Sequence, residues 1–278
     1  MSDQNLASQW AVIHHLLDLA NRAGLGELFA LRGSLLLKAW YGNNAREPGD
    51  IDWVWANGDD RIASHGLSKG RFTLFLRLVM KHPATCDVTI AIRKITDAPI
   101  SDNDEYRPGI SGRRLTFPWR DATGATGAVQ VDFALYDYND IPLVTVSRAA
   151  IPNRATGVPT YVTAVSKEDA LLWKLRWLDA DATERGAAQG KDLYDAVLLA
   201  EDIRLPVALF VSRLPPSLHD YTQVLLTEPS GLGEFPLMWN VDWESFQQAH
   251  PQIDGSAMDW QIRLTLALAP TFSDSEQK

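Results

Sequence analysis

The sequence contains the stretch Arg32-Gly33-Ser34, followed sixteen residues after the serine by Asp50-Ile51-Asp52. The glycine and serine predict a turn that opens a helix, and the two aspartates lie in a predicted short strand. Side chains two positions apart on a strand project to the same face, so Asp50 and Asp52 are expected to lie side by side, with the apolar residues between and after them facing the other way. Two adjacent carboxylates repel each other unless a cation lies between them. This stretch therefore predicts a cation site beside a tight turn.

The turn beside the two aspartates indicates which ligand would bind together with the cation. A Gly-Ser turn at the start of a helix can present backbone N–H groups to phosphate oxygens. Mg²⁺ is commonly held by one or two carboxylates together with the phosphates of a substrate. We therefore expect Gly33 and Ser34 to bind a nucleoside triphosphate, and Asp50 and Asp52 to bind Mg²⁺ or Mn²⁺. The pattern is typical of phosphoryl- or nucleotidyl-transfer proteins.

Composition sets the broad class of the protein. Its 278 residues, 46% of them hydrophobic, can bury one large core or two modest ones. No apolar run is long enough to span a membrane, and residues 1–9 lack the basic and apolar blocks of a signal peptide. Cys86 is the only cysteine, which excludes an internal disulfide and a multi-cysteine metal site. A soluble cytoplasmic protein without membrane contact is the simplest expectation.

Charge is unevenly distributed along the chain. The net charge of −9 argues against indiscriminate nucleic-acid binding. Residues 61–120, however, hold 11 Lys and Arg against 5 Asp and Glu, whereas residues 201–278 hold 4 against 11. The basic stretch is either a solvated face or an electropositive patch that receives an RNA backbone.

Periodicity and turn residues predict an α+β protein with two domains, residues 1–160 and 161–278. In the first, we expect helices over 9–22, 35–41 and within 61–81 (where Gly66 and Gly70 could divide the helix), strands over 28–31, 50–55, 88–92, 115–117, 129–135 and 158–165, and a loop over 97–112. In the second, we expect helices from a capping box at residues 166–169 to 180, over 191–201, and near 205–214, 241–249 and 257–268.

Asp132 is a third candidate carboxylate. It alternates with apolar residues in the predicted strand over 129–135, which places it on the more polar face. Together with Asp50 and Asp52 on a neighbouring strand, it would complete a cluster able to hold one or two metal ions. The alternative is an ordinary aspartate that faces solvent.

Lys174 and Asp192 are candidates in the helical domain. Lys174 lies on or beside the apolar stripe of its helix, where a lysine is costly unless it meets an anion such as a triphosphate. Alternatively, its stem packs while the ammonium reaches water. Asp192 and Asp195 lie in the first turns of the next predicted helix, where the helix dipole alone favours acidic residues. Asp192 is therefore equally compatible with a structural and a functional role, and Asp195 favours the structural one.

Taken in order, these segments resemble the AbiEii-type nucleotidyltransferase toxins, a branch of the polymerase-β-like superfamily that includes the MenT toxins. The resemblance covers residues 10–205 and rests on five pieces, at residues 31–34, 46–52, 129–133, 165–174 and 190–195. The first two pieces form one motif that is shared by the whole superfamily, and the later Ser…Lys and Lys-Asp-x-x-Asp pieces narrow the resemblance to this branch. One departure is Arg32, because many relatives have a glycine at this position.

The resemblance implies a nucleotidyltransferase fold, with a twisted mixed sheet flanked by helices and a helical second domain. It also implies transfer of a nucleoside monophosphate from an NTP, commonly to the 3′ end of tRNA, and neutralisation by a separate antitoxin. Carried over by residue, Gly33 and Ser34 would bind triphosphate, Asp50 and Asp52 the metal, and Lys174 the phosphates. Asp192 would be a further active-site acid.

Two other functions remain open from the sequence. The acidic C-terminal region favours a cationic small molecule, or else a protein, as acceptor in place of RNA. A nucleotide-binding module without turnover is the alternative outside enzymes.

Overall fold

The computed structural model describes residues 3–56, 63–99, 110–136, 145–153, 156–213 and 239–273. The chain divides into two compact units, Met1–Val165 and Ser166–Lys278. The expected boundary after residue 160 would separate the first residue of strand β9 (Thr160–Val165) from the rest of that strand. Within the described residues, no helix is long and apolar enough to cross a membrane.

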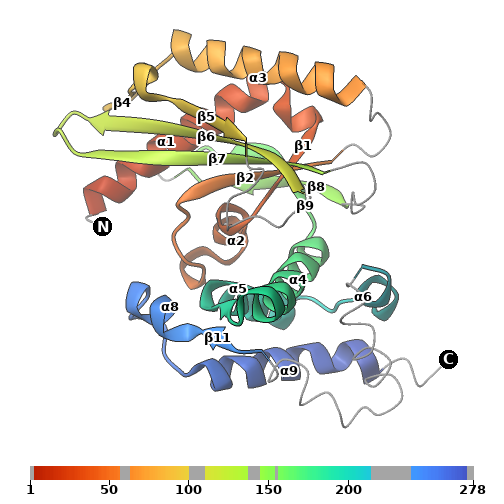
Figure 1. Ribbon diagram of the computed structural model, residues 1–278. Coiled ribbons are helices and arrows are strands. Elements are labelled where there is room, and N and C mark those ends of the chain that lie inside the picture. The colour runs from red at the N-terminus through yellow and green to blue at the C-terminus, as the bar shows by residue number, and fades with distance from the viewer. Residues whose placement is uncertain are drawn as a thin grey trace. The chain divides into compact units, whose positions relative to one another are not determined.

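The first unit combines a mixed sheet with flanking helices (Figure 1). Its helices and strands are α1 (Asp3–Arg22), β1 (Phe29–Arg32), α2 (Ser34–Tyr41), β2 (Asp50–Trp55), α3 (Ala63–Lys81), β3 (Ala84–Thr85), β4 (Val88–Ile90), β5 (Thr96–Pro99), β6 (Ile110–Asp121), β7 (Thr126–Tyr136), β8 (Val146–Ile151) and β9. The described strands lie in the order β3-β4-β6-β7-β2-β1-β9-β8, and β5 pairs with β6. Among the described strand pairs of this sheet, only β2–β7 and β1–β9 are parallel. The predicted α+β class is confirmed.

Helices α1 and α3 contact each other, and both pack against the apolar face of the sheet (Figure 1). From α3, the ring centroid of Phe72 lies 4.6 Å from that of Phe133 on β7, and the centroid of Phe75 lies 5.7 Å from that of Phe117 on β6. These aromatic pairs bury large apolar surfaces in edge-to-face geometry. These contacts hold α3 against strands β6 and β7.

Strand β2 has the alternation that its sequence predicts. Ile51, Trp53 and Trp55 are buried on the apolar face, whereas Asp50 and Asp52 retain partial exposure. The hydrophobic residues fix which face points to the core, because a shift of one residue would bury the carboxylates instead. The paired carboxylates therefore lie on the face opposite α3.

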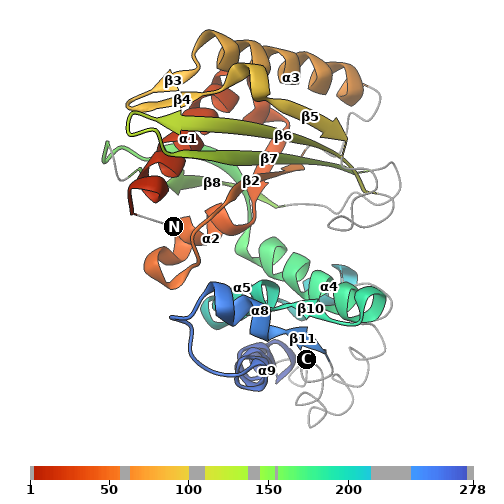
Figure 2. The ribbon, with the colours of Figure 1, turned by 60° about the vertical axis from the view of Figure 1, so that its left-hand side comes forward.

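The second unit is mainly helical (Figure 2). Its elements are α4 (Lys167–Arg185), β10 (Ala188–Gln189), α5 (Gly190–Asp202), α6 (Val207–Arg213), β11 (Val241–Asp242), α8 (Trp243–Ala249) and α9 (Ala257–Ser273). Helix α5 contacts α4, α8 and α9. The predicted apolar stripe of α4, formed by Leu171, Leu175 and Leu178, is fully buried. At the start of α4, the Ser166 hydroxyl accepts from the Asp169 N–H at 3.1 Å, which confirms the predicted cap.

Several expectations about elements were wrong. Helix α3 is continuous through Gly66 and Gly70, and the two strands expected over 115–117 and 129–135 are the middle of a much longer hairpin, β6–β7. The expected loop over 97–112 contains the end of β5 and the start of β6, while residues 100–109 lie outside the described part. Pro99 is tolerated because it ends an edge strand, where a missing N–H removes no ladder bond. Strands β3, β5, β8, β10 and β11 were not expected.

Candidate active site

Gly33 has a backbone conformation that other residues avoid, with φ 81° and ψ −162°. A Cβ atom placed on it would lie 2.2 Å from Oδ2 of Asp52, closer than any two such atoms can approach. Gly33 is therefore needed for two reasons, its dihedral angles and the absence of a side chain. The Asp52 carboxylate lies directly against the turn, as the sequence predicts.

Ser34 connects the same turn to the other aspartate. It is the first residue of α2, it is buried, and its hydroxyl donates to Oδ1 of Asp50 at 3.2 Å. The short helix α2 thus begins beside both carboxylates. Strand β2 holds Asp50 and Asp52 on the face that this turn adjoins.

The sheet register aligns four charged residues in one row. Asp52 on β2 lies opposite Arg32 on β1 and opposite Asp132 on β7, and Asp132 in turn lies opposite Arg114 on β6. Directly opposed residues of neighbouring strands point to the same face of a sheet. The three predicted aspartates therefore lie on one face of adjacent strands.

Asp132 does not face solvent, which excludes the alternative for this residue. Its exposed fraction is only 2%. Arg114 donates from Nε to Oδ1 at 2.9 Å and from Nη2 to Oδ2 at 2.8 Å, and Gln130 donates to Oδ2 at 3.0 Å. Such a two-pronged guanidinium contact is among the strongest that a carboxylate makes. Arg114 was not predicted as a site residue from the sequence, although the register of the β6–β7 hairpin pairs it with Asp132.

The oxygen donors of Asp50 and Asp52 are chemically compatible with a magnesium ion that also binds the phosphates of a substrate. Within the described residues, no group of three or more acidic, histidine or cysteine side chains is arranged to hold a metal, so the expected three-carboxylate cluster is not assembled. Asp132 instead contacts Arg114 and Gln130. Asp50 and Asp52 supply hard oxygen ligands, and Mg²⁺ typically needs only one or two carboxylates when phosphates provide others.

The loop between α2 and β2 is held by a buried lysine, Lys38, which was not among the residues predicted for the site. The Lys38 ammonium lies 2.6 Å from Oε1 of Glu47 and donates to the Ala45 carbonyl at 3.1 Å. The indole of Trp10 on α1 donates to the other Glu47 oxygen at 3.1 Å. These contacts fix the chain just before Asp50 and so support the position of the aspartate strand.

In the second unit, Lys174 is buried between two carboxylates. Its Nζ atom lies 2.7 Å from Oδ1 of Asp192 and 2.8 Å from Oδ2 of Asp195, and all three residues are at most 5% exposed. The alternative of an ammonium that reaches water is therefore wrong. The structure places anions for Lys174 within its own unit, and contact with phosphates stays a prediction. Burial, assisted by the Asp195 charge, raises the pKa of the neighbouring Tyr194 hydroxyl.

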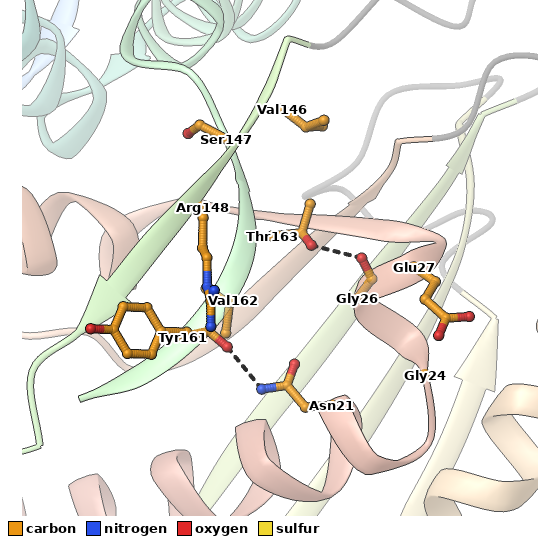
Figure 3. A pocket seen from close by; sticks show the side chains of 10 residues that line it. All are labelled: Asn21, Gly24, Gly26, Glu27, Val146, Ser147, Arg148, Tyr161, Val162 and Thr163. Carbon is orange, nitrogen blue, oxygen red and sulfur yellow. Dashed lines mark hydrogen bonds between the residues drawn. The ribbon is translucent and has the colours of Figure 1, made fainter. Parts of the chain in front are cut away.

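A surface groove lies in the first unit among the end of α1, the segment after it, and strands β8 and β9 (Figure 3). Its volume is about 510 Å³. The guanidinium of Arg148 lies 4.4 Å from the ring centroid of Tyr161, and Asn21 donates to the Tyr161 carbonyl at 2.9 Å. Thr163 closes the groove toward Gly26 through a hydrogen bond of 2.8 Å. None of these residues belongs to the row of aspartates.

Comparison with protein families gives a match over most of the chain. Residues 15–267 match the family described as nucleotidyl transferase AbiEii toxin, type IV toxin–antitoxin system. No match was found among curated proteins.

Three solved structures that this chain matches are distant from it in sequence. A candidate nucleotidyltransferase from H. pylori is 15% identical with a TM-score of 0.51, covering 100% of this chain and 98% of that one. MenT4, a nucleotidyltransferase toxin from Mycobacterium tuberculosis H37Rv, is 14% identical with a TM-score of 0.42, covering 96% and 93%. The antibiotic-resistance factor ANT(2'')-Ia is 11% identical with a TM-score of 0.34, covering 87% and 98%. The first of these supports the nucleotidyltransferase fold.

Proposed function

The chain belongs to the AbiEii family of nucleotidyltransferase toxins, and from this premise we propose that it transfers a nucleoside monophosphate from an NTP to RNA, with the tRNA 3′ end as the favoured acceptor. The observation that carries this proposal is the contact between the Gly33 turn and the paired carboxylates of β2. This arrangement can hold a phosphate chain and a divalent ion at one place. NTPs and tRNA occur in the cytoplasm, where we propose that the protein acts.

Each residue has a proposed role in the transfer. Backbone N–H groups at Gly33 and Ser34 bind triphosphate oxygens, while Asp50 and Asp52 hold Mg²⁺ or Mn²⁺. The bound ion supplies neutralisation of the charge that develops on the phosphoryl oxygens. An acceptor hydroxyl then forms a new bond to the α-phosphorus as the bond to pyrophosphate breaks. Asp132 serves either as acceptor of the hydroxyl proton or as metal ligand, in which case the proton passes to solvent.

Lys174 and Asp192 are proposed to act on the leaving group. A buried lysine paired with carboxylates is held in one orientation, which favours a positioned cation over a mobile one. We assign Lys174 to the phosphates and Asp192 to its orientation as a further active-site acid. A separate antitoxin protein that neutralises the chain is the partner proposed from the family.

Incubation of the purified protein with each labelled NTP and total tRNA tests the proposal. Label is expected in RNA with the wild-type protein and is expected to be lost with Asp52→Ala and with Asp52→Asn, which keeps the size of the side chain. Asp87→Asn is a matched control, because Asp87 is exposed in the same unit. No label in RNA with the wild-type protein, under conditions where its fold is intact, would contradict the proposal.

A second acceptor class is favoured by one observation. Residues 201–278 carry 11 acidic against 4 basic residues, a balance that attracts a cationic small molecule more than a polyanion. Labelled aminoglycoside or labelled protein without labelled RNA would identify this class. NTP binding without release of pyrophosphate over hours would instead indicate a binding module without turnover.

A further inference from the structure

The contact between Arg114 and Asp132 occupies a carboxylate that adjoins the candidate metal site. Asp132 lies directly opposite Asp52 in the register, and both of its oxygens accept from the Arg114 guanidinium. Gln130 donates to one of the same oxygens. The side chain of Asp132 is only 3% exposed, whereas that of Arg114 is 19% exposed and so lies nearer the surface.

A guanidinium and a divalent cation compete for the same carboxylate oxygens. While Arg114 holds both oxygens of Asp132, this carboxylate cannot be a full metal ligand beside Asp52. A buried carboxylate that loses its cation without a replacement is strongly destabilised, so Arg114 can leave Asp132 only if another positive charge arrives. A divalent ion bound at Asp52 would be such a charge.

A triphosphate offers Arg114 a matching new partner. The planar fork of a guanidinium binds phosphate oxygens as well as it binds a carboxylate, and its charge does not depend on pH in the physiological range. Exchange of Asp132 for a phosphate therefore preserves the pairing of every charge. Gln130 would keep its contact with Asp132 during this exchange and hold the carboxylate in place.

We propose that Arg114 is a positioning residue that exchanges Asp132 for a phosphate of the bound NTP and thereby releases Asp132 to the metal. This inference rests on the proposed function and adds a coupling between its two ligands. Without nucleotide, Arg114 opposes metal binding at Asp132, and with nucleotide it promotes binding of the phosphates. Loss of the guanidinium should then change the two affinities in opposite directions.

The test measures each ligand without the other in Arg114→Gln. Mn²⁺ binding to the nucleotide-free protein, followed by electron paramagnetic resonance, is expected to be about tenfold tighter than in the wild type. NTP binding in the presence of EDTA, followed by calorimetry, is expected to be about tenfold weaker. General damage to the fold would weaken both, so the opposite signs identify the exchange. Arg114→Lys keeps the positive charge without the planar fork. Its affinities for Mn²⁺ and for NTP are expected to lie between those of the wild type and those of Arg114→Gln.

Two further variants make the outcome specific. Arg113→Gln changes the adjacent residue, which pairs with Asp97 and lies over the Phe72 ring on the other face, and should leave both affinities unchanged. The gain in Mn²⁺ affinity should be absent when Arg114→Gln is combined with Asp132→Asn. Unchanged or weaker Mn²⁺ binding in Arg114→Gln and Arg114→Lys would overturn the inference. If the wild type still labels an acceptor, only the inference fails, whereas a wild type that neither binds NTP nor transfers label removes the proposed function itself.

Discussion

Gly33 meets two structural requirements of the candidate site, an unusual backbone conformation and the absence of a side chain. Its dihedral angles lie in a region that is nearly restricted to glycine, and any side chain would displace the Asp52 carboxylate. We expect Gly33→Ala to lower the free energy of unfolding by about 1–3 kcal/mol through backbone strain. Because misplacement of a catalytic group by about 1 Å can cost about 100-fold in rate, label transfer should fall by about that factor. Denaturant unfolding and the labelling assay measure the two effects.

Gly49→Ala is the matched control for this prediction. Gly49 directly precedes the aspartate strand, and a Cβ atom on it would meet nothing within 4 Å. The free energy of unfolding of the Gly49→Ala variant should differ from that of the wild type by no more than about 0.5 kcal/mol. Equal behaviour of the two alanine variants would show that the Gly33 turn does not constrain Asp52.

The buried His14 imidazole makes the free energy of unfolding depend on pH. Burial lowers the pKa of its imidazole, although the backbone carbonyl of Pro152 opposes this effect. The unfolded chain, with a histidine pKa of about 6.5, therefore binds the proton more readily than the folded protein. The contribution of the neutral ring is complete above about pH 6.5 and is lost as the pH falls through that value toward the lower folded pKa.

The variant His14→Gln isolates this contribution. Between about pH 7 and pH 5, the free energy of unfolding should fall less steeply in the variant, by at most about 1.4 kcal/mol per pH unit for one proton. Denaturant titrations at several pH values give the slope. Parallel slopes for the two proteins would show that His14 binds its proton equally in both states.

At the scale of elements, helices α4 and α5 are joined by the buried charges of Lys174, Asp192 and Asp195. Removal of the lysine would leave two buried carboxylates without this cation, which typically costs about 3–5 kcal/mol. We therefore expect Lys174→Met to destabilise the second unit by about that amount in denaturant unfolding. A loss of label transfer in a Lys174 variant would then report folding as well as chemistry.

A triple variant separates these two effects. Replacement of Lys174 by Met together with Asp192→Asn and Asp195→Asn removes the charges and should recover most of the stability lost in Lys174→Met, while activity stays absent. If Lys174→Met alone costs less than about 1 kcal/mol, the buried charges do not stabilise the contact between the two helices.

Helices and strands were predicted correctly where neighbouring residues indicate the same structure. They were predicted wrongly where pairing between strands determines their length. Strand β2 was predicted with its bounds because its apolar residues alternate with aspartates, and the start of α4 followed from the cap at Ser166. The hairpin β6–β7 was predicted too short because Gly112 and Pro118 are poor strand residues in isolation. Eleven cross-strand pairs outweigh those local preferences.

At the scale of the whole molecule, the first unit holds the Gly33 turn and the three aspartates, and the second holds Lys174 and Asp192. Residues 1–165 contain their own aromatic core, so we expect this fragment to fold alone and to bind Mn²⁺ in a manner abolished by Asp52→Asn. It should not transfer label, because it lacks Lys174. Circular dichroism, Mn²⁺ binding and the labelling assay check these points, and an unfolded fragment would show that the first unit depends on the second.

The local features of this protein followed from its amino acids alone. Alternation along β2 and the cap of α4 involve neighbours within a few positions, and backbone geometry imposes them directly. The partners of the charged groups depended on the assembled fold. Arg114 meets Asp132 through hairpin register, and Asp195 joins Asp192 at Lys174 through helix packing. Such contacts join residues that are 18 or more positions apart in the sequence. At that separation the spacing of residues does not determine which charges meet, and the pairs form because opposite charges are buried together.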